Sequence, residues 1–222
     1  MAYILNIETS TTNCSVAVSY NGDQISLKED NNKQYSHAER LHLYIEQVLT
    51  AAGIDSKTLD AVSVSMGPGS YTGLRIGVSA AKGLCFALDI PLISIPTLDS
   101  LSRKININDG YIVPLIDARR MEVYTAIFDS EYSCIESTSA KILDAKSYNK
   151  ILESNSVYFV GNATQKLNTI INHKNAVFSE QLPSASQMCS LSHQKFEAKI
   201  FEDTAYFEPY YLKDFVAFPS KK

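Results

Sequence analysis

The residues most suited to a chemical role form a glycine-rich segment at positions 67–75, which reads GPGSYTGLR. It lies between a short apolar run at residues 61–65 and a helix-forming run at residues 76–88. Backbone N–H groups at the start of a helix carry partial positive charge and lack intrahelical partners, so such a loop is able to bind a phosphate. The loop residues that would serve this purpose are Gly67, Gly69, Thr72, Gly73 and Arg75.

The common nucleotide-binding fingerprints do not fit this loop. It has no Lys followed by Ser or Thr, as a P-loop requires, and its three glycines do not have the spacing of a dinucleotide-binding loop. An alternative is a tight turn, capped by Ser70 or Thr72, that lets a close-packed helix begin. Both interpretations stay open from the sequence.

Two carboxylates stand at equivalent places in the two halves of the chain. Residues 4–8 (ILNIE) align with residues 113–117 (VPLID), so Glu8 and Asp117 both end an apolar run. The turn after Glu8 contains hydroxyls without glycine, and the turn after Asp117 contains two arginines. A phosphate clamp needs close approach of the backbone, which side chains obstruct, so a complete clamp is not expected. The residues either end strands or form a vestigial nucleotide site, whose candidates are Glu8, Ser10 and Asp117.

Metal and nucleophile chemistry find little support in the sequence. His37 and His42 lie about 140° apart around a predicted helix, whereas a chelating pair needs i, i+4 spacing, and we expect both to face solvent or an interface. The four cysteines form no C-x-x-C pair, and no serine lies in a G-x-S-x-G elbow. The sequence therefore predicts no catalytic residue, no metal site and no cofactor.

The elements that would hold these residues occur twice along the chain. Hydrophobic periodicity predicts the order βββαβαβ in each half. In the first half the strands are 3–7, 14–19, 24–28, 61–65 and 91–95, with helices at 35–52 and 76–88. In the second half the strands are 111–116, 123–128, 133–136, 157–160 and 176–178, with helices at 144–152 and 163–171.

This duplication resembles the α/β fold shared by actin, sugar kinases and Hsp70 ATPase domains, called the ASKHA fold. We expect an N-terminal lobe at residues 1–104 and a reduced C-terminal lobe at residues 105–222, which includes a C-terminal helix and tail. In active members of this fold, paired acidic turns face one nucleotide across a cleft. The alignment of Glu8 with Asp117 therefore agrees with the predicted architecture.

Composition limits the classes of function. The chain has 222 residues, a net charge of −4 and a sequence pI near 5.6. Without a broad basic field, tight and sequence-independent binding of nucleic acid by this chain alone is not expected. The N-terminal apolar run is too short for a signal peptide or a membrane span, which predicts a cytoplasmic protein without a membrane partner.

The two predicted helices of the first half differ in their apolar surface. The helix at 35–52 has one apolar stripe, whereas the helix at 76–88 is apolar on all sides and carries a row of small residues. Each exposed large apolar side chain forfeits on the order of 1.5–3 kcal/mol, so either a partner or the first helix must cover this surface. The predicted partner interface consists of Leu41, Tyr44, Ile45, Val48, Leu74, Gly77, Val78, Ala81, Leu84 and Cys85.

Several segments together resemble the TsaB (YeaZ) family. They are ILNIETS at 4–10, GPGSYTGLRIG at 67–77, KGL at 82–84, PTLDSL at 96–101, IDARRMEVY at 116–124 and YYL at 210–212. The resemblance implies a bacterial, non-catalytic scaffold that helps to make N6-threonylcarbamoyladenosine at the position 3′ to the anticodon of tRNAs. It implies two partners: a TsaD-like subunit, which transfers threonylcarbamoyl from its adenylate, and a TsaE-like ATPase. It further implies a homodimer when the chain is alone, and contact with tRNA only through the complex.

The resemblance also implies a degenerate relative of the catalytic subunit. In TsaD-like chains an HHMEGH segment follows the strand that corresponds to residues 91–95, and two of its histidines bind metal. Here Thr97 and Leu101 take those positions. The family more often has Asp where Glu8 stands and a glycine near Arg120, so residual nucleotide binding is not implied. The rival functions are a small-molecule kinase or ATPase of the same fold, or a glycoprotease-like peptidase.

Overall fold

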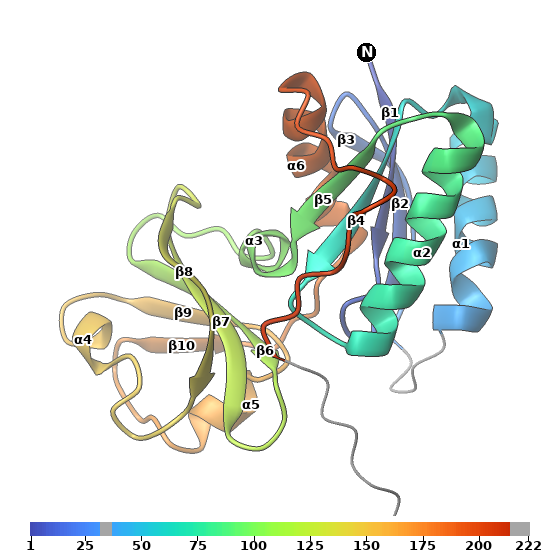
Figure 1. Cartoon of the computed structure of the whole chain (residues 1–222). Helices are drawn as coiled ribbons and strands as arrows, with labels where there is room; N and C mark the ends of the chain where they lie inside the picture. Colours follow the sequence, from blue (N-terminus) through green and yellow to red (C-terminus); the bar gives the residue numbers. More distant parts are fainter. Residues whose placement is uncertain (32–36, 214–222) are drawn as a thin grey trace, which may run out of the picture.

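A computed structural model describes residues 1–31 and 37–213, which form two α/β lobes, each built on a five-stranded sheet (Figure 1). The first sheet has the order β3-β2-β1-β4-β5, and the second has the order β10-β9-β6-β7-β8. The first contains β1 (Tyr3–Glu8), β2 (Cys14–Tyr20), β3 (Asp23–Asp30), β4 (Ala61–Gly67) and β5 (Leu92–Pro96). The second contains β6 (Tyr111–Asp117), β7 (Glu122–Asp129), β8 (Cys134–Ile142), β9 (Val157–Val160) and β10 (Ala176–Ser179).

The two sheets repeat one topology. In each, the first three strands pair antiparallel, and the first strand then pairs in parallel with the fourth, which pairs with the fifth. All ten predicted strands are present, and β8 continues six residues beyond its predicted end at residue 136. The α/β class and the duplicated ASKHA-like topology predicted from the sequence are therefore confirmed.

The helices on the outer face of each sheet differ greatly in length. On the first sheet lie α1 (His37–Ala52) and α2 (Tyr71–Leu88), whereas the second sheet is covered by the short helices α4 (Asn149–Leu152) and α5 (Thr164–Asn168). A short 3-10 turn, Ser56–Thr58, precedes β4. The predicted helix at 144–152 is shortened because Tyr148 has a φ of 65°, outside the helical region. The first two residues of the predicted helix 35–52 lie outside the described residues.

Alternating side chains along the first strand of each sheet supply two cores. In β1, Leu5 and Ile7 belong to the core beneath α1 and α2, whereas Ile4 belongs to the core on the opposite face. In β6, Val113 faces the core shared with α4 and α5, and Ile112 faces the other side. Both sheets are therefore covered on both faces, as parallel strands require.

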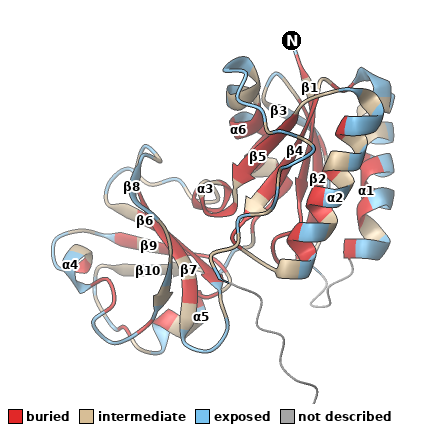
Figure 2. Ribbon diagram, viewed as in Figure 1, coloured by how far each residue is buried: buried red, intermediate tan, exposed pale blue. Residues whose placement is uncertain are grey.

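The inner face of each sheet is covered by a helix that follows the other sheet in the chain. The helix α3 (Thr97–Ser102) follows β5 and packs on β6 and β7 through Leu98 and Leu101. The helix α6 (Ala185–Glu197) follows β10 and packs on β1, β2, β3 and β5. In Figure 2, α3 lies between the lobes, and all of its residues except Asp99 are buried. The predicted boundary near residue 104 therefore stays a proposal about where the duplicated halves meet in the sequence. In space, α6 comes from the second half and completes the first lobe.

A polar cluster fixes the start of α6 to the first sheet. Glu29 Oε2 accepts hydrogen bonds from Ser184 Oγ at 2.6 Å, Ser15 Oγ at 3.0 Å and Asn13 Nδ2 at 3.4 Å. Burial alone would raise the pKa of the Glu29 carboxyl, but these three donors outweigh it and hold the pKa below its usual value. Ser184 is also the N-cap of α6, because its side chain accepts from Ser186 N–H.

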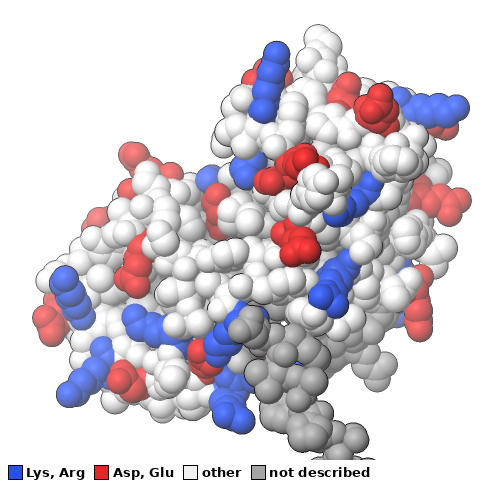
Figure 3. Space-filling model, in the orientation of Figure 1, with Lys and Arg blue, Asp and Glu red and all other residues white. Residues whose placement is uncertain are grey.

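In the part of the chain that the structure describes, no helix is both long enough and apolar enough to cross a membrane. On the face shown in Figure 3, Lys and Arg are dispersed among Asp and Glu, so this face has no broad basic area. This face therefore offers no large positive field to which nucleic acid could bind.

Candidate functional site

The glycine loop is shorter than the sequence predicted, because α2 already begins at Tyr71. Ser70 is the N-cap, and its hydroxyl accepts from Gly73 N–H at 3.2 Å. Of the two capping residues considered from the sequence, Ser70 is therefore the one used. Gly67 has a φ of 110°, a conformation that side chains rarely adopt, and this explains the glycine at the end of β4.

The start of α2 is occupied by the chain itself. Ser70 N–H donates to the carbonyl oxygen of Ser10 at 2.6 Å, and Thr9 Oγ1 donates to the carbonyl oxygen of Gly73 at 2.8 Å. A Cβ on Gly69 would collide with Ser10, and a Cβ on Gly73 or Gly77 would collide with Thr9. The glycine row therefore allows α2 to lie directly on the β1–β2 turn, which supports the close-packing interpretation over the phosphate cradle.

Glu8 is enclosed beneath this turn, with 0% of its surface exposed. Its Oε1 accepts hydrogen bonds from Ser10 N–H at 2.5 Å and from Ser65 Oγ at 3.0 Å. Burial raises the pKa of the Glu8 carboxyl above its usual value, and these hydrogen bonds offset the rise only in part. Ser10 is also buried. Because it is fully buried, the Glu8 carboxyl is not placed to hold a metal–nucleotide complex.

Asp117, the equivalent residue of the second lobe, is exposed. Its Oδ1 lies 2.7 Å from Lys166 Nζ and accepts from Arg119 N–H at 2.5 Å. The backbone at Arg119 and Arg120 has φ values of 69° and 49°, so both residues adopt a left-handed conformation in a turn without glycine. Glu8 and Asp117 therefore lie in unlike surroundings, one enclosed and one open.

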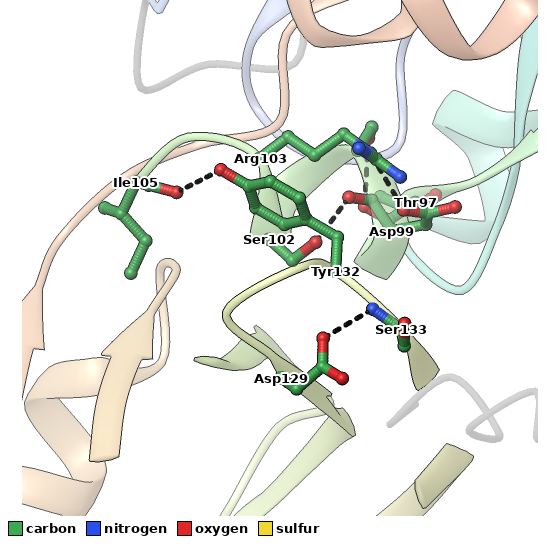
Figure 4. Close-up of polar contacts among 9 residues, drawn as sticks. Thr97, Asp99, Ser102, Arg103, Ile105, Asp129, Tyr132 and Ser133 are labelled. Atoms are coloured by element: carbon green, nitrogen blue, oxygen red, sulfur yellow. Dashed lines mark hydrogen bonds and ion pairs between the residues drawn. The ribbon is translucent and has the colours of Figure 1, made fainter. Parts of the chain in front are cut away.

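The segment where the resemblance placed two metal-binding histidines is a structural junction. Thr97 and Leu101 are buried in α3. Close to them Arg103 Nε contacts Asp99 Oδ1 at 3.1 Å, and the Arg103 guanidinium lies over the Tyr132 ring (Figure 4). In residues 1–31 and 37–213, no group of three or more His, Cys, Asp or Glu side chains is arranged to bind a metal ion.

The two histidines of α1 have different surroundings. The expectation that His37 faces solvent is wrong, because its side chain is buried and its Nε2 lies 2.7 Å from the carbonyl oxygen of Thr11. Burial lowers the pKa of His37, and the contact with Thr11 opposes this effect. His42 is exposed on the side of α1 that faces α2.

The predicted interface residues lie mainly inside the first lobe. Leu84 is half-buried at the surface, whereas the other nine are enclosed between α1, α2 and the sheet. Those nine are Leu41, Tyr44, Ile45, Val48, Leu74, Gly77, Val78, Ala81 and Cys85. These residues lie on α1 and α2, but on the faces that pack inside the lobe, because a helix that is apolar all round does not reveal which side the sheet covers. Contact of this helix pair with a partner stays a prediction, and it must use side chains other than these nine.

The outer surface of this helix pair is an open groove of ≈ 710 Å³. Its walls come from α1 and α2, whose exposed and half-buried residues show as blue and tan in Figure 2. Among the described residues that line it, Arg75 alone carries a formal charge, and the apolar walls include Ile76, Ala80 and Leu84. Phe86, on the same helix, is 87% exposed. The sequence singled out Arg75 and Leu84, but gave no sign that Phe86 would lie outside the core.

Residues 198–213, which we call the strap, run from α6 back over the first lobe and toward β6 (Figure 1). The strap pairs with β5, where Glu202 N–H donates to the carbonyl oxygen of Leu92 at 2.9 Å. It also contacts the end of β4, where Tyr210 N–H donates to the carbonyl oxygen of Met66 at 2.7 Å. Its last described residue, Lys213, forms an ion pair with Glu122 in β7. The strap therefore connects the two lobes across the edge of the first sheet.

These features define a duplicated α/β protein with a covered first acidic turn and an open groove on one helix pair. The family model described as TsaD, tRNA N6-adenosine threonylcarbamoyltransferase, matches residues 31–219. The chain is 28% identical to the tRNA threonylcarbamoyladenosine biosynthesis protein TsaB of Haemophilus influenzae over 95% of this chain and 93% of that protein. It is also 28% identical to TsaB of Escherichia coli K12 over 96% of both chains.

A solved structure of YeaZ from Pseudomonas aeruginosa matches 96% of this chain and 100% of that chain, with a TM-score of 0.82 and 24% identity. That similarity concerns the fold alone. Together with the family match and the full-length relatives, it confirms the resemblance that the sequence motifs indicated. The chain belongs to the TsaD family and, within it, to the TsaB (YeaZ) proteins of tRNA threonylcarbamoyladenosine biosynthesis.

Proposed function

We propose that this chain is a non-catalytic scaffold and activating subunit in tRNA threonylcarbamoylation. It acts with a TsaD-like catalytic subunit and a TsaE-like ATPase in the cytoplasm, it forms a homodimer when alone, and it meets tRNA only through the complex. The relatives' names support the pathway. The observation that carries the non-catalytic role is the covered first acidic turn, since Glu8 is fully buried and the start of α2 is filled by Ser10.

The groove between α1 and α2 is the proposed docking site for the TsaD-like subunit. It is open and mostly apolar, and an exposed phenylalanine, Phe86, lies on the same helix α2. Exposed apolar surface of this kind is a feature of protein interfaces. Its small residues, Ala80 and Gly83, leave room for a partner helix to approach closely. The groove does not depend on the buried residues that the sequence nominated.

Reconstitution tests the role of the chain. The chain, the TsaD-like and TsaE-like proteins of the same organism, threonylcarbamoyl-AMP and unmodified tRNA are combined, and each protein is omitted in turn. We expect the chain alone to modify no tRNA and its omission to abolish modification over repeated turnovers. Modification that proceeds equally well without the chain would refute the scaffold role. Turnover of ATP by the chain alone, with sub-millimolar binding of ATP and Mg²⁺ in calorimetry, would instead favour the hypothesis of a small-molecule kinase or ATPase.

A charge in the groove tests its position. Gly83 is exposed and a Cβ there would contact nothing within 4 Å, so Gly83→Glu is compatible with the fold and improves helix propensity. Burying this unpaired charge against a partner should weaken binding of the TsaD-like subunit on the order of 100-fold. The matched control is Gln47→Glu, which adds the same charge to an exposed position of α1 outside the groove and should leave the affinity unchanged. Equal affinities of the two variants would refute this location.

A further inference from the structure

We propose that the end of the strap at Tyr211 is part of the partner-binding face, because Tyr211 positions Arg75 to bind a carboxylate of the partner. This inference rests on the proposed function, in which the partner is the TsaD-like subunit. It adds the chemistry of one contact and names a positioning residue outside the helix pair. The argument depends on how Arg75 is held, on the charge of the groove and on how the strap is fixed.

Arg75 is held by two aromatic rings at the rim of the groove. Its guanidinium carbon lies 4.0 Å from the centroid of the Tyr71 ring and 5.9 Å from that of Tyr211. Its Nε–H donates to the Tyr211 hydroxyl at 3.1 Å, and the two ring centroids lie 5.0 Å apart. An exposed arginine loses much rotamer entropy when it binds a ligand. Because the contacts with Tyr71 and Tyr211 already restrict the Arg75 side chain in the free protein, less entropy is lost on binding.

The chemistry of the groove indicates a single carboxylate as the group that Arg75 binds. A guanidinium offers a planar fork of donors that matches the two oxygens of a carboxylate. Among the described residues that line the groove, only Arg75 is charged. Nucleic acid would require several cations along its path, so a protein carboxylate fits this surface better. Phe86 lies eleven residues later on α2, about 20° around the axis from Arg75, and supplies an apolar anchor on the same side.

The strap is anchored by contacts that do not involve Arg75. Lys82 Nζ donates to the carbonyl oxygens of Ala205 at 3.1 Å and Phe207 at 3.0 Å, and Tyr210 N–H donates to Met66 at 2.7 Å. A Cβ on Gly67 would come within 2.8 Å of the Tyr210 carbonyl oxygen, so the strap lies closely against the end of β4. The strap backbone that precedes Tyr211 is therefore fixed by its contacts with Lys82 and Met66, and Tyr211 in turn positions Arg75.

A double-mutant cycle tests this arrangement. Affinity for the TsaD-like protein of the same organism is measured by calorimetry at 50 mM and 500 mM NaCl for the full chain and for Arg75→Ala, Tyr211→Ala and the double variant. We expect Arg75→Ala to weaken binding about tenfold and to reduce its salt dependence, and Tyr211→Ala to weaken it about threefold to fivefold. The double variant should bind no more weakly than Arg75→Ala, because Tyr211 acts through Arg75.

The control is Tyr206→Ala, which removes another tyrosine of the strap that is 83% exposed, and it should leave the affinity unchanged. Thermal melting verifies that each variant is folded. If the unchanged chain does not bind the TsaD-like protein, the proposed function fails. If it binds and Arg75→Ala binds equally well, or if the two single losses add in the double variant, the inference fails while the proposed function stands. Arg75→Ala effects confined to self-association or to binding of free tRNA would also overturn it.

Discussion

The two lobes share one strand order, yet they treat the same carboxylate position in opposite ways. In the first lobe the 18-residue α2 covers the turn after β1, and Glu8 is fully buried. In the second lobe the equivalent helix, α5, has five residues, and Asp117 is exposed beside Lys166. Duplication therefore preserves the strands, whereas the helix after the fourth strand decides whether the acidic turn is open or covered.

The lobes resemble each other most where backbones must approach closely. Gly67 ends β4 and Gly161 follows β9, with φ values of 110° and 140°, and a Cβ on Gly161 would collide with the Leu115 carbonyl. They differ at the next step, because only α2 continues with glycines at every fourth residue over Thr9. The covered state of the first lobe thus depends on three glycines, and the predictions below test this dependence and the contrast with the second lobe.

The largest effect is expected where a methyl group would separate α2 from the β1–β2 turn. Gly73→Ala places a Cβ against the Thr9 carbonyl, where backbone cannot easily move, and should lower the free energy of unfolding by about 2–3 kcal/mol. Gly83→Ala is the matched control on the same helix, because its Cβ meets nothing within 4 Å, and it should raise the free energy of unfolding by about 0.5–1 kcal/mol. Urea denaturation measures both. Changes of the same sign would contradict close packing at Gly73.

The second effect concerns the helix that the second half of the chain contributes to the first lobe. Ser184→Ala removes the N-cap of α6 and one donor to Glu29, which should destabilise the fold by about 1–2 kcal/mol. Ser190→Ala alters an exposed serine within the same helix and should be neutral or slightly stabilising. If the first lobe were complete without α6, urea denaturation would show little difference between the two variants.

Strand positions could be predicted from the sequence because apolar and polar residues alternate clearly, and the aligned carboxylates revealed the duplication. The exposed face of α2 could not be predicted in this way. Gly77 and Ala81 belong to the predicted partner interface, but Gly77 faces Thr9 within the same lobe, and Ala81 belongs to its core. Small residues indicate close approach of another backbone without indicating which one. Tertiary packing supplies that information.

Contacts between distant segments were also beyond the sequence. The strap was recognised only as a tail with the motif YYL, and its link from Tyr211 to Arg75 spans 136 residues. The short helix α3 was missed because six residues give too little periodicity, and its burial depends on Ile112 and Phe128 of the second sheet. His37 was misplaced for a related reason, since its polar partner is a backbone carbonyl, Thr11, that no side-chain pattern reveals.

The third prediction is a change in pH dependence. Burial raises the folded pKa of Glu8 above its usual 4.5. The stability that the protonated Glu8 carboxyl contributes is therefore fully present below pH 4.5 and is lost as the pH rises through the folded pKa. Glu8→Gln keeps acceptors for Ser10 N–H and Ser65 Oγ without ionising. Relative to the unchanged chain, the variant should therefore gain stability in urea denaturation as the pH rises above 4.5 through the folded pKa of Glu8. A constant difference across this range would show that Glu8 is not buried as a protonated acid.

The smallest effect is expected at the open turn of the second lobe. Asp117→Asn removes the charge that pairs with Lys166 but keeps an oxygen for Arg119 N–H, and a partly exposed pair contributes at most about 0.5 kcal/mol. The loss should shrink further at 500 mM NaCl, where exposed charges are screened. Because Glu8 and Asp117 occupy equivalent positions, the paired variants isolate the effect of covering. A loss above 2 kcal/mol for Asp117→Asn would mean that the second turn is as integrated as the first, and that the length of the following helix does not explain the difference between the lobes.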